Sequence, residues 1–422
     1  MSRGNSYYQR DRGKGLKRVM IAALVVVVLV VALVSVQLLR STPRPIAVST
    51  VPSSTVIPGN IPSLPWPNQG SSDIALVGVG SVGNHGQTSP IGLASVAKII
   101  TALVIIHDHP LSLGQSGPSI VVSPTDVSNY QNMLAAQDSV MAVVSGESLT
   151  EYQALQALLV PSADNVAIML ANWDAGSVSN FVTKMNAMAN ELGMKHSHYT
   201  DPSGLYSTTQ GTAPDQLVAA ETLLDSPVLS SIVAMPQATL PVAGIVYNVN
   251  ALVGHDGITG VKTGSTPAGG NYVFSGSINL PNTVALPSAI ASNPTAVGVV
   301  LGQQGYTPLP SALSAGQALL DAFRKVPQAE SVVSAGQTVG VVQAPGENSV
   351  AIVAKSGVSL IGWPSLVVHY TFTPKKNLPR SFAAGYEVGM LEVSIGTESS
   401  KVPVVVTKGV IAPGVSWKLR RL

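Results

Sequence analysis

The sequence predicts an α+β body, a small all-β region after it, and one membrane-spanning helix before it. One uninterrupted apolar segment lies near the N-terminus of the 422-residue chain. The middle of the chain mixes strand and helix signals, and from Glu330 onward short Val-rich strands alternate with Gly, Pro and Lys turns. A chain of this length has room for roughly two or three domains.

The composition excludes several classes of protein. Cysteine is absent, which excludes disulfides, Cys-ligated metals and a thiol nucleophile. The net charge is only +2 and the basic residues cluster only at the N-terminus, whereas a nucleic-acid-binding protein usually carries a basic stripe. We therefore expect no nucleic acid partner.

Residues 19–39 carry no charge and consist mostly of Val, Leu, Ala and Ile. An apolar run of this length can span the ~30 Å hydrocarbon layer as a helix. Residues 1–18 are rich in Arg and Lys, with Asp11 as their single acid. The positive-inside rule makes them a cytoplasmic tail and places everything after the helix outside, in a single-pass protein of the cell membrane. A cleaved signal peptide is the alternative, but the apolar run is longer than usual and no clear A-x-A site follows it.

Residues 40–72 contain repeated Pro among Ser, Thr and Gly, a composition that predicts a semi-extended linker. The body then runs over residues 73–326. Its predicted elements are a strand at 74–79, a buried helix at 97–106, a helix from a capping box at Ser148 and Glu151 to Val160, helices at 179–192 and from 212 to 224, strands at 261–265, 271–275 and 296–301, and a helix at 314–325.

The tail, residues 330–422, is expected to form a small β-sandwich-like domain. It carries a weak internal repeat, S-A-G-Q-T-V-G at 334–340 and A-A-G-Y-E-V-G at 383–389. Two copies are too few for a solenoid, so we expect two equivalent hairpins.

The first motif with chemical meaning is Ser95-Val96-Ala97-Lys98, at the start of the apolar helix. Residues three apart on a helix share a face, so the Lys98 amine can reach the Ser95 hydroxyl. A serine needs an adjacent base to become a nucleophile, and a lysine is a base only when neutral, a state that burial favours. Alone, the pattern is common by chance and usually marks an ordinary helix start.

The second motif, Ser162 followed by Ala163, Asp164 and Asn165, stands directly after Pro161. A hydroxyl beside a lysine can relay a proton to a leaving group, but a Ser after Pro is also an ordinary helix N-cap.

The third motif, Lys262-Thr263-Gly264-Ser265, lies on a predicted strand. The Lys ammonium and the Thr hydroxyl can bind a carboxylate, and the glycine lets the strand backbone approach it closely. For this motif alone, a solvent-facing Lys beside a turn is the plainer interpretation.

In this order, spaced by about 67 and 100 residues, the three motifs resemble those of the penicillin-recognising serine acyl-transferases. The segments N-A-M-A-N-E-L-G-M (186–194), D-P-S-G-L (201–205) and G-I-T-G-V-K-T-G (257–264) narrow the resemblance to the low-molecular-mass penicillin-binding proteins, the D-alanyl-D-alanine carboxypeptidases of peptidase family S11. It covers residues 73–326 and, more loosely, the tail. The resemblance implies a penicillin-binding-protein/β-lactamase-like transpeptidase domain, an antiparallel sheet flanked by helices, with a β domain after it.

The resemblance also implies a function, removal of the terminal D-alanine from peptidoglycan stem peptides. By this resemblance Ser95 is the catalytic nucleophile, Lys98 the general base and Ser162 the group that passes a proton to the departing amine. β-Lactams, which mimic the D-Ala-D-Ala dipeptide, are expected to acylate Ser95. No metal or cofactor is implied.

The third motif is implied to bind the substrate. Lys262 and Thr263 would hold the terminal carboxylate, next to Gly264. The backbone N–H groups of Ser95 and Ser265 would form the oxyanion hole.

The chain departs from the family at the second motif, where the pattern S-x-N becomes Ser162-Ala163-Asp164 with Asn165 next. An ionised Asp cannot donate a hydrogen bond to a substrate carbonyl, whereas Asn can. Three alternatives follow: the backbone shifts so that Asn165 takes the place of the family Asn, or Asp164 bonds a lysine, or activity is reduced. The departure keeps a second hypothesis open, a weakly active or inactive peptidoglycan-binding homologue; a β-lactamase is a third.

Two further patterns are judged not to carry function. Gly78-Val-Gly-Ser-Val-Gly83 matches a dinucleotide fingerprint, but residues 84–90 cannot open the required helix, so we expect a glycine-rich hairpin turn. The His-Asp-His run at 107–109 and the His pair at 196 and 198 lack helical ligand spacing, and we expect no metal there.

Overall fold

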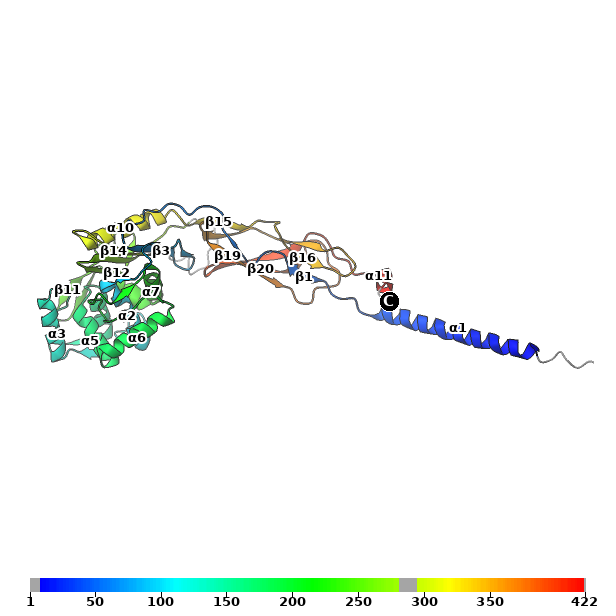
Figure 1. The fold of residues 1–422 in the computed structure, drawn as a ribbon, viewed down its shortest axis with the longest axis horizontal. Helices are drawn as coiled ribbons and strands as arrows, with labels where there is room; N and C mark the ends of the chain where they lie inside the picture. Colours follow the sequence, from blue (N-terminus) through cyan, green and yellow to red (C-terminus); the bar gives the residue numbers. More distant parts are fainter. Residues whose placement is uncertain (1–7, 281–293, 421–422) are drawn as a thin grey trace, which may run out of the picture.

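The computed structural model describes residues 8–280 and 294–420. The molecule is elongated, with the N-terminal helix at one end, the all-β region in the middle and the helix-rich body at the other end (Figure 1). Helix α1 (Tyr8–Leu39) contains a stretch of 25 residues, Gly15–Leu39, that is long and apolar enough to cross a membrane and is not buried in the protein. Its position near the N-terminus fits a membrane anchor or a signal sequence.

The body is built from short and long strands with helices between them. Its strands are β3 (Ser71–Leu76), β4 (Gly80–Ser81), β5 (His85–Gly86), β6 (Ile91–Gly92), β7 (Ser119–Val121), β8 (Ser148–Thr150), β9 (Gln210–Gly211), β10 (Gln237–Leu240), β11 (Gly244–Tyr247), β12 (Ile258–Thr266), β13 (Gly269–Ser277) and β14 (Thr295–Gln303). Its helices are the 3₁₀ turn η1 (Ala94–Ala97), α2 (Lys98–Asp108), α3 (Pro124–Ala135), α4 (Glu151–Leu159), α5 (Asp164–Ala175), α6 (Val178–Glu191), α7 (Ala213–Asp225), α8 (Pro227–Val233) and α10 (Pro308–Phe323).

An antiparallel sheet in the order β12-β13-β14-β3-β4 forms the centre of the body. Alternate residues of its strands face opposite sides: Val273 on β13 packs with the helices around α2, whereas Tyr272 and Phe274 pack against α10. The sheet thus has helices on both of its faces, which is the fold class that the sequence predicts. Strand β12 lies at one edge and leaves that edge facing the site described below.

Helix α2 is the centre of the helical layer. Every residue from Lys98 to Ile105 is buried, as its apolar sequence predicts, so the expected helix at 97–106 is confirmed with a slightly later start. A helix buried on all sides has a fixed position, which matters because its first residue is Lys98.

The expected capping box at Ser148 and Glu151 is wrong. Ser148 pairs with Val121 between β8 and β7, so the backbone stays extended for two more residues. Thr150 is the N-cap instead: its side chain accepts the N–H of Gln153, and the Gln153 side chain accepts the N–H of Thr150. The same chemistry therefore acts two residues later.

The glycine-rich segment after β3 is a hairpin turn, as expected. Ala75 pairs with Ser81 and Leu76 with Gly80, and Gly78 has a φ of +80°. The chain enters no helix until η1.

The all-β region contains β1 (Ile46–Ser49), β2 (Ser54–Val56), β15 (Gln328–Val333), β16 (Thr338–Gln343), β17 (Val350–Ala354), β18 (Val358–Gly362), β19 (Val367–Pro374), β20 (Glu387–Ile395) and β21 (Glu398–Val406), followed by helix α11 (Val415–Leu419). A seven-stranded sheet runs in the order β1-β16-β17-β21-β20-β19-β2. The two-stranded ribbon β15–β18 lies over this sheet. The ring of Phe323 on α10 packs edge-on against the ring of Trp363, just after β18, with 5.6 Å between the ring centroids, and this contact joins the all-β region to the body.

Residues 40–72 differ from the expected free linker. Strand β1 pairs with β16 and β2 pairs with β19, so this segment supplies both edges of the seven-stranded sheet. The Pro residues around these strands are compatible with edges because an edge strand leaves one side of its backbone unpaired.

The internal repeat of the tail corresponds to an equivalent turn and strand in each copy. Gly336 and Gly385 have φ of +78° and +79°, and their N–H groups donate to the carbonyls of Ala354 and Val406 respectively. Those carbonyls belong to β17 and β21, which pair with each other. The two copies therefore lie on either side of the β17–β21 pair.

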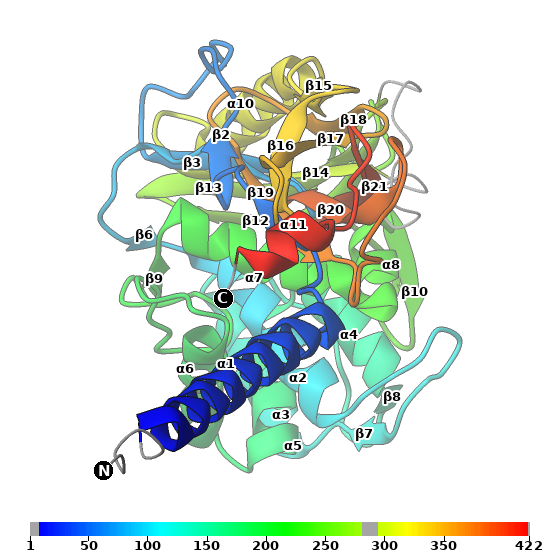
Figure 2. The ribbon, with the colours of Figure 1, turned by 90° about the vertical axis from the view of Figure 1, so that its right-hand side faces the viewer.

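The last described helix was not expected from the sequence. Helix α11 returns to the C-terminal end of α1 (Figure 2), where Gln37 Nε2 donates to the carbonyl of Lys418 at 3.1 Å and Lys418 Nζ donates to the carbonyl of Leu38 at 2.9 Å. The C-terminal end of α1 and helix α11 thus lie together at one end of the β domain.

A buried carboxyl of the β domain makes its stability pH-dependent. Glu398 at the start of β21 is fully buried and accepts the N–H of Ile361, and burial raises its pKa from 4.5 to about 7. The folded chain therefore binds the proton of the Glu398 carboxyl more tightly than the unfolded chain does. The stabilisation of the fold that comes from this protonation is present below pH ~4.5 and is lost as the pH rises through about 7.

The free energy of unfolding of the parent chain should fall as the pH rises from about 5 to about 8. We expect this fall to be smaller by about 1–3 kcal/mol in Glu398→Gln, measured by chemical denaturation at each pH. The matched control is Glu387→Gln, at an exposed carboxylate of β20, which should leave the pH dependence unchanged. Equal pH dependence in the parent chain and Glu398→Gln contradicts the prediction.

Candidate active site

The first motif has the geometry that its spacing predicts. Ser95 lies in η1, and Lys98 begins α2 one turn later. Lys98 Nζ donates to Ser95 Oγ at 2.8 Å. The amine and the hydroxyl are therefore in direct contact, with the amine supplied by a helix that cannot shift within its apolar surroundings.

Three oxygen atoms surround the Lys98 amine. Besides Ser95 Oγ, Nζ donates to Asp164 Oδ1 at 2.5 Å and to the carbonyl of Ser203 at 3.1 Å. The side chain of Lys98 is fully buried, and this burial lowers its pKa, while the nearby Asp164 carboxylate acts in the opposite direction. Burial therefore brings the amine closer to the neutral state that a base requires.

Asp164 bonds a lysine, which was one of the alternatives that the sequence left open. It is the first residue of α5, and its side chain is almost fully buried. Burial raises the pKa of Asp164, and the Lys98 ammonium opposes this change. The family position for a neutral amide thus holds a carboxyl in contact with the catalytic lysine candidate.

Asn165 does not replace the missing amide. Its Nδ2 donates to the carbonyl of Met141 and its Oδ1 accepts the N–H of Met141, both at 3.0 Å. The buried amide therefore fixes the segment before β8 through both its oxygen and its nitrogen.

The second motif lies against the third. Ser162 has a φ of +65°, a left-handed conformation that is uncommon for a residue other than glycine. Its Oγ accepts a hydrogen bond from Lys262 Nζ at 2.9 Å. Ser162 is not the N-cap of α5, which is Ala163, so the ordinary capping role is excluded.

Lys262 and Thr263 are buried on the edge strand β12, not exposed beside a turn. Burial holds the pKa of Lys262 well below its usual range, and the nearby Lys98 acts in the same direction. The site thus brings two buried lysine amines and one buried carboxyl together.

Gly264 brings the edge strand against Ser95. A Cβ at this position would lie 2.8 Å from the carbonyl oxygen of Leu93 and 3.0 Å from the backbone nitrogen of Ser95. Only a glycine permits this approach, so the backbone of β12 and the backbone of Ser95 form one wall of the site.

A loop that the sequence reasoning gave no role completes the site. The Asp201 carboxylate accepts hydrogen bonds from the backbone N–H groups of Ser203, Gly204 and Leu205 and from the Thr209 hydroxyl. This bonding fixes the Ser203 carbonyl that faces Lys98. The run Asp-Pro-Ser-Gly is a typical signal for such a turn, but its partner 105 residues away along the chain could not be read from it.

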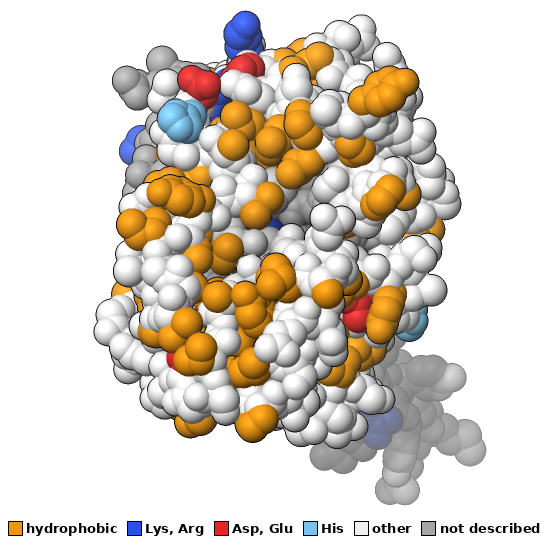
Figure 3. All heavy atoms as spheres, turned by 90° about the vertical axis from the view of Figure 1, so that its left-hand side faces the viewer, with side chains coloured by type: hydrophobic (Ala, Val, Ile, Leu, Met, Phe, Trp, Pro, Cys, Tyr) orange, Lys and Arg blue, Asp and Glu red, His pale blue; other side chains and the backbone are white. Residues whose placement is uncertain are grey.

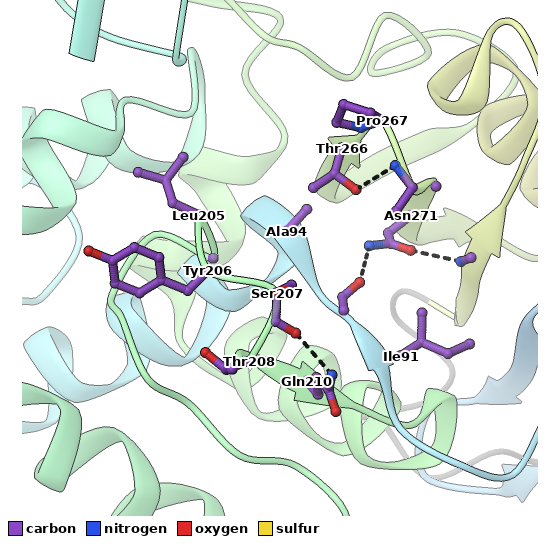
Figure 4. Close-up of a pocket in the computed structure, with 15 residues that line it drawn as sticks. Ile91, Ala94, Leu205, Tyr206, Ser207, Thr208, Gln210, Thr266, Pro267 and Asn271 are labelled. Carbon is purple, nitrogen blue, oxygen red and sulfur yellow. Dashed lines mark hydrogen bonds between the residues drawn. The ribbon is translucent and has the colours of Figure 1, made fainter. Parts of the chain in front are cut away.

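A cavity of about 770 Å³ opens beside η1, between residues 91–94, the loop 204–210 and the end of the β12–β13 hairpin. Its 15 lining residues include none with a charged side chain (Figure 4). Asn271 crosses its floor, donating to the carbonyls of Gly92 and Leu93. The end of the molecule shown in Figure 3 is hollowed near its centre and carries mostly hydrophobic and uncharged polar side chains.

Comparison with known proteins agrees with this geometry. Residues 82–286, which contain all three motifs, match the family model of peptidase S11, D-alanyl-D-alanine carboxypeptidase. This region belongs to peptidase family S11. The expected resemblance is thereby confirmed.

The individual relatives share only a moderate sequence identity with this chain. The chain is 34% identical over 182 residues to the D-alanyl-D-alanine carboxypeptidase DacB2 of Mycobacterium tuberculosis, a match that covers 42% of this chain and 58% of that protein. It is 27% identical over 191 residues to the carboxypeptidase DacF of Bacillus subtilis, covering 43% of this chain and 47% of that one. The chain thus spans about half the length of these curated relatives.

The S11 region and the β domain together have a known fold. PBP3 of Streptococcus pneumoniae, a peptidoglycan synthesis regulatory factor, matches with a TM-score of 0.57 at 21% identity, covering 81% of this chain and 98% of that one. Penicillin binding protein 5 of Haemophilus influenzae matches with a TM-score of 0.55 at 18% identity, covering 84% and 100%. The expected fold class, a penicillin-binding-protein-like domain followed by an all-β domain, is confirmed.

We expect Gly264→Ala to lower the rate at which a fluorescent penicillin labels Ser95 by about 10- to 100-fold, because the new Cβ pushes the strand away from Ser95. The control Gly414→Ala, just before α11, places its Cβ where no atom lies within 4 Å and should label at the parental rate. Labelling of Gly264→Ala at the parental rate contradicts the close approach.

Proposed function

We propose that this protein is a serine-type D-alanyl-D-alanine carboxypeptidase that removes the terminal D-alanine from peptidoglycan stem peptides. The observation that carries the proposal is the contact of 2.8 Å between the buried Lys98 amine and the Ser95 hydroxyl, beside a second buried lysine on an edge strand. A serine with an adjacent buried amine is an activated nucleophile.

The proposed acylation begins when neutral Lys98 takes the proton of the Ser95 hydroxyl. The Ser95 oxygen then bonds to the carbonyl carbon before the last D-alanine, and the C–N bond to that D-alanine breaks. The proton that Lys98 has taken then passes through Ser162 to the departing amine. The Ser162 hydroxyl also contacts Lys262. Water hydrolyses the resulting ester on Ser95, which restores the enzyme and releases the shortened peptide.

The edge strand gives the substrate a direction. Lys262 and Thr263 are assigned to the terminal carboxylate, and the N–H groups of Ser95 and Ser265 to the carbonyl oxygen of the scissile bond. The cavity lies beyond Ser265, with Thr266 and Pro267 in its lining, so the part of the peptide before the scissile bond would extend into it.

The domain assignment follows the same proposal. Residues 73–326 would carry catalysis, and residues 330–422, with β1 and β2, would form a non-catalytic domain between the catalytic domain and α1. We propose that α1 is an uncleaved single-pass anchor and that both domains lie outside the cell membrane, since Arg and Lys precede the apolar segment.

The central test uses the full-length protein in detergent, incubated with fluorescent penicillin. We expect a covalent adduct whose mass shift maps to Ser95, and release of D-alanine from a peptide ending in D-Ala-D-Ala. Ser95→Ala should lose both. Absence of any adduct on the parent chain rules out the acylating serine, and rapid turnover of the penicillin adduct would indicate a β-lactamase.

The anchor is tested separately in intact cells that express the full chain. We expect the protein to stay in the membrane fraction after an alkaline wash, and external protease to digest the body while a tag at the N-terminus stays protected. Release of a shortened chain into the soluble fraction would indicate a cleaved signal peptide instead.

A further inference from the structure

The contact between Asp164 and Lys98 changes what is required of the base. Lys98 Nζ has three oxygen neighbours, and the carbonyl of Ser203 and the carboxylate of Asp164 accept but do not donate when the acid is ionised. An ammonium with three N–H donors satisfies all three neighbours. A neutral amine keeps two donors for Asp164 and Ser203 and uses its lone pair to accept the Ser95 proton.

The two states differ by one proton, and the carboxylate favours the state that cannot act as a base. At 2.5 Å in a buried site, a negative charge on Asp164 stabilises the ammonium strongly. A neutral amide oxygen at the same position could accept the same hydrogen bond without this charge.

Other charged groups act on the pair from each element that packs around it. Lys262 approaches from β12, Asp138 from the segment between α3 and β8, and Asp201 from the loop before β9. Asp201 is fully engaged by its own loop, and Asp138 acts through space, so Asp164 is the single carboxyl among them that touches the Lys98 amine.

We propose that Asp164 is a positioning residue that holds Lys98 in its protonated form, so that acylation of Ser95 requires a higher pH than it would with a neutral side chain at position 164. This inference rests on the proposed function, because it concerns the base of the same reaction. The proton must leave Lys98 for solvent before the Ser95 proton can be accepted, and the carboxylate opposes that release. Burial raises the pKa of Asp164 and lowers the pKa of Lys98, whereas the contact between the two charged groups acts against both changes.

The test measures the rate of penicillin labelling against pH for the full-length parent and for Asp164→Asn. We expect the rising limb of the profile to move by about 1–3 pH units toward acid in the variant, and its rate at pH 7 to rise about 10-fold or more. The control Asp138→Asn removes a carboxylate that does not contact Lys98 and should move the limb much less. Thermal unfolding of each protein verifies that the variants are folded.

The outcomes separate this inference from the proposed function. An unchanged limb in Asp164→Asn, or an equal shift in Asp138→Asn, overturns the role of Asp164 while leaving the acylating serine intact. A folded Asp164→Asn that labels more slowly at every pH also overturns it, because the carboxylate would then assist the reaction. Absence of labelling in all proteins at all pH values refutes the proposed function itself.

Discussion

The burial of a lysine amine is the constraint on which the site depends. Removing an ammonium from water costs several kcal/mol unless acceptors replace the water. Lys98 receives them from three segments that are far apart in the chain: Ser95 in its own turn, Asp164 at the start of α5 and the Ser203 carbonyl in the loop before β9. Each segment is fixed in turn by its own contacts, so the chemistry of one amine determines how the helical layer and the loop meet.

A second buried amine extends this constraint to the sheet. Lys262 on the edge strand is held by Ser162, and the two lysines with Asp164 leave one excess positive charge if all three are ionised. Such an arrangement is poised for an anion, because an incoming carboxylate would neutralise the charge that burial disfavours. The electrostatics of the site and the chemistry of the proposed substrate therefore agree.

Glycine allows the backbones to meet where these side chains converge. Gly264 brings β12 against the amide of Ser95, and a Cβ on Gly204, which has a φ of +84°, would overlap the carbonyl of Ala94. Away from the site, β1 and β2 join the segment after α1 to both edges of the all-β domain. The part between α1 and the region that matches peptidase S11 is thus a packed sheet, a stiffer connection than the Pro-rich sequence alone suggested.

The sequence by itself determined the elements whose signals are local. The apolar helix starting near Ser95, the strand carrying Lys262 and the glycine-rich turn after β3 follow from hydrophobic period, motif spacing and turn chemistry, and the ordered motifs identified the family. Only the tertiary structure decided that Asp164 bonds Lys98, that Asn165 is used by Met141, and that residues 46–56 add strands to a sheet made mostly of residues after 337. The physical reason is that these contacts join residues from 24 to more than 290 positions apart, so no local pattern specifies them.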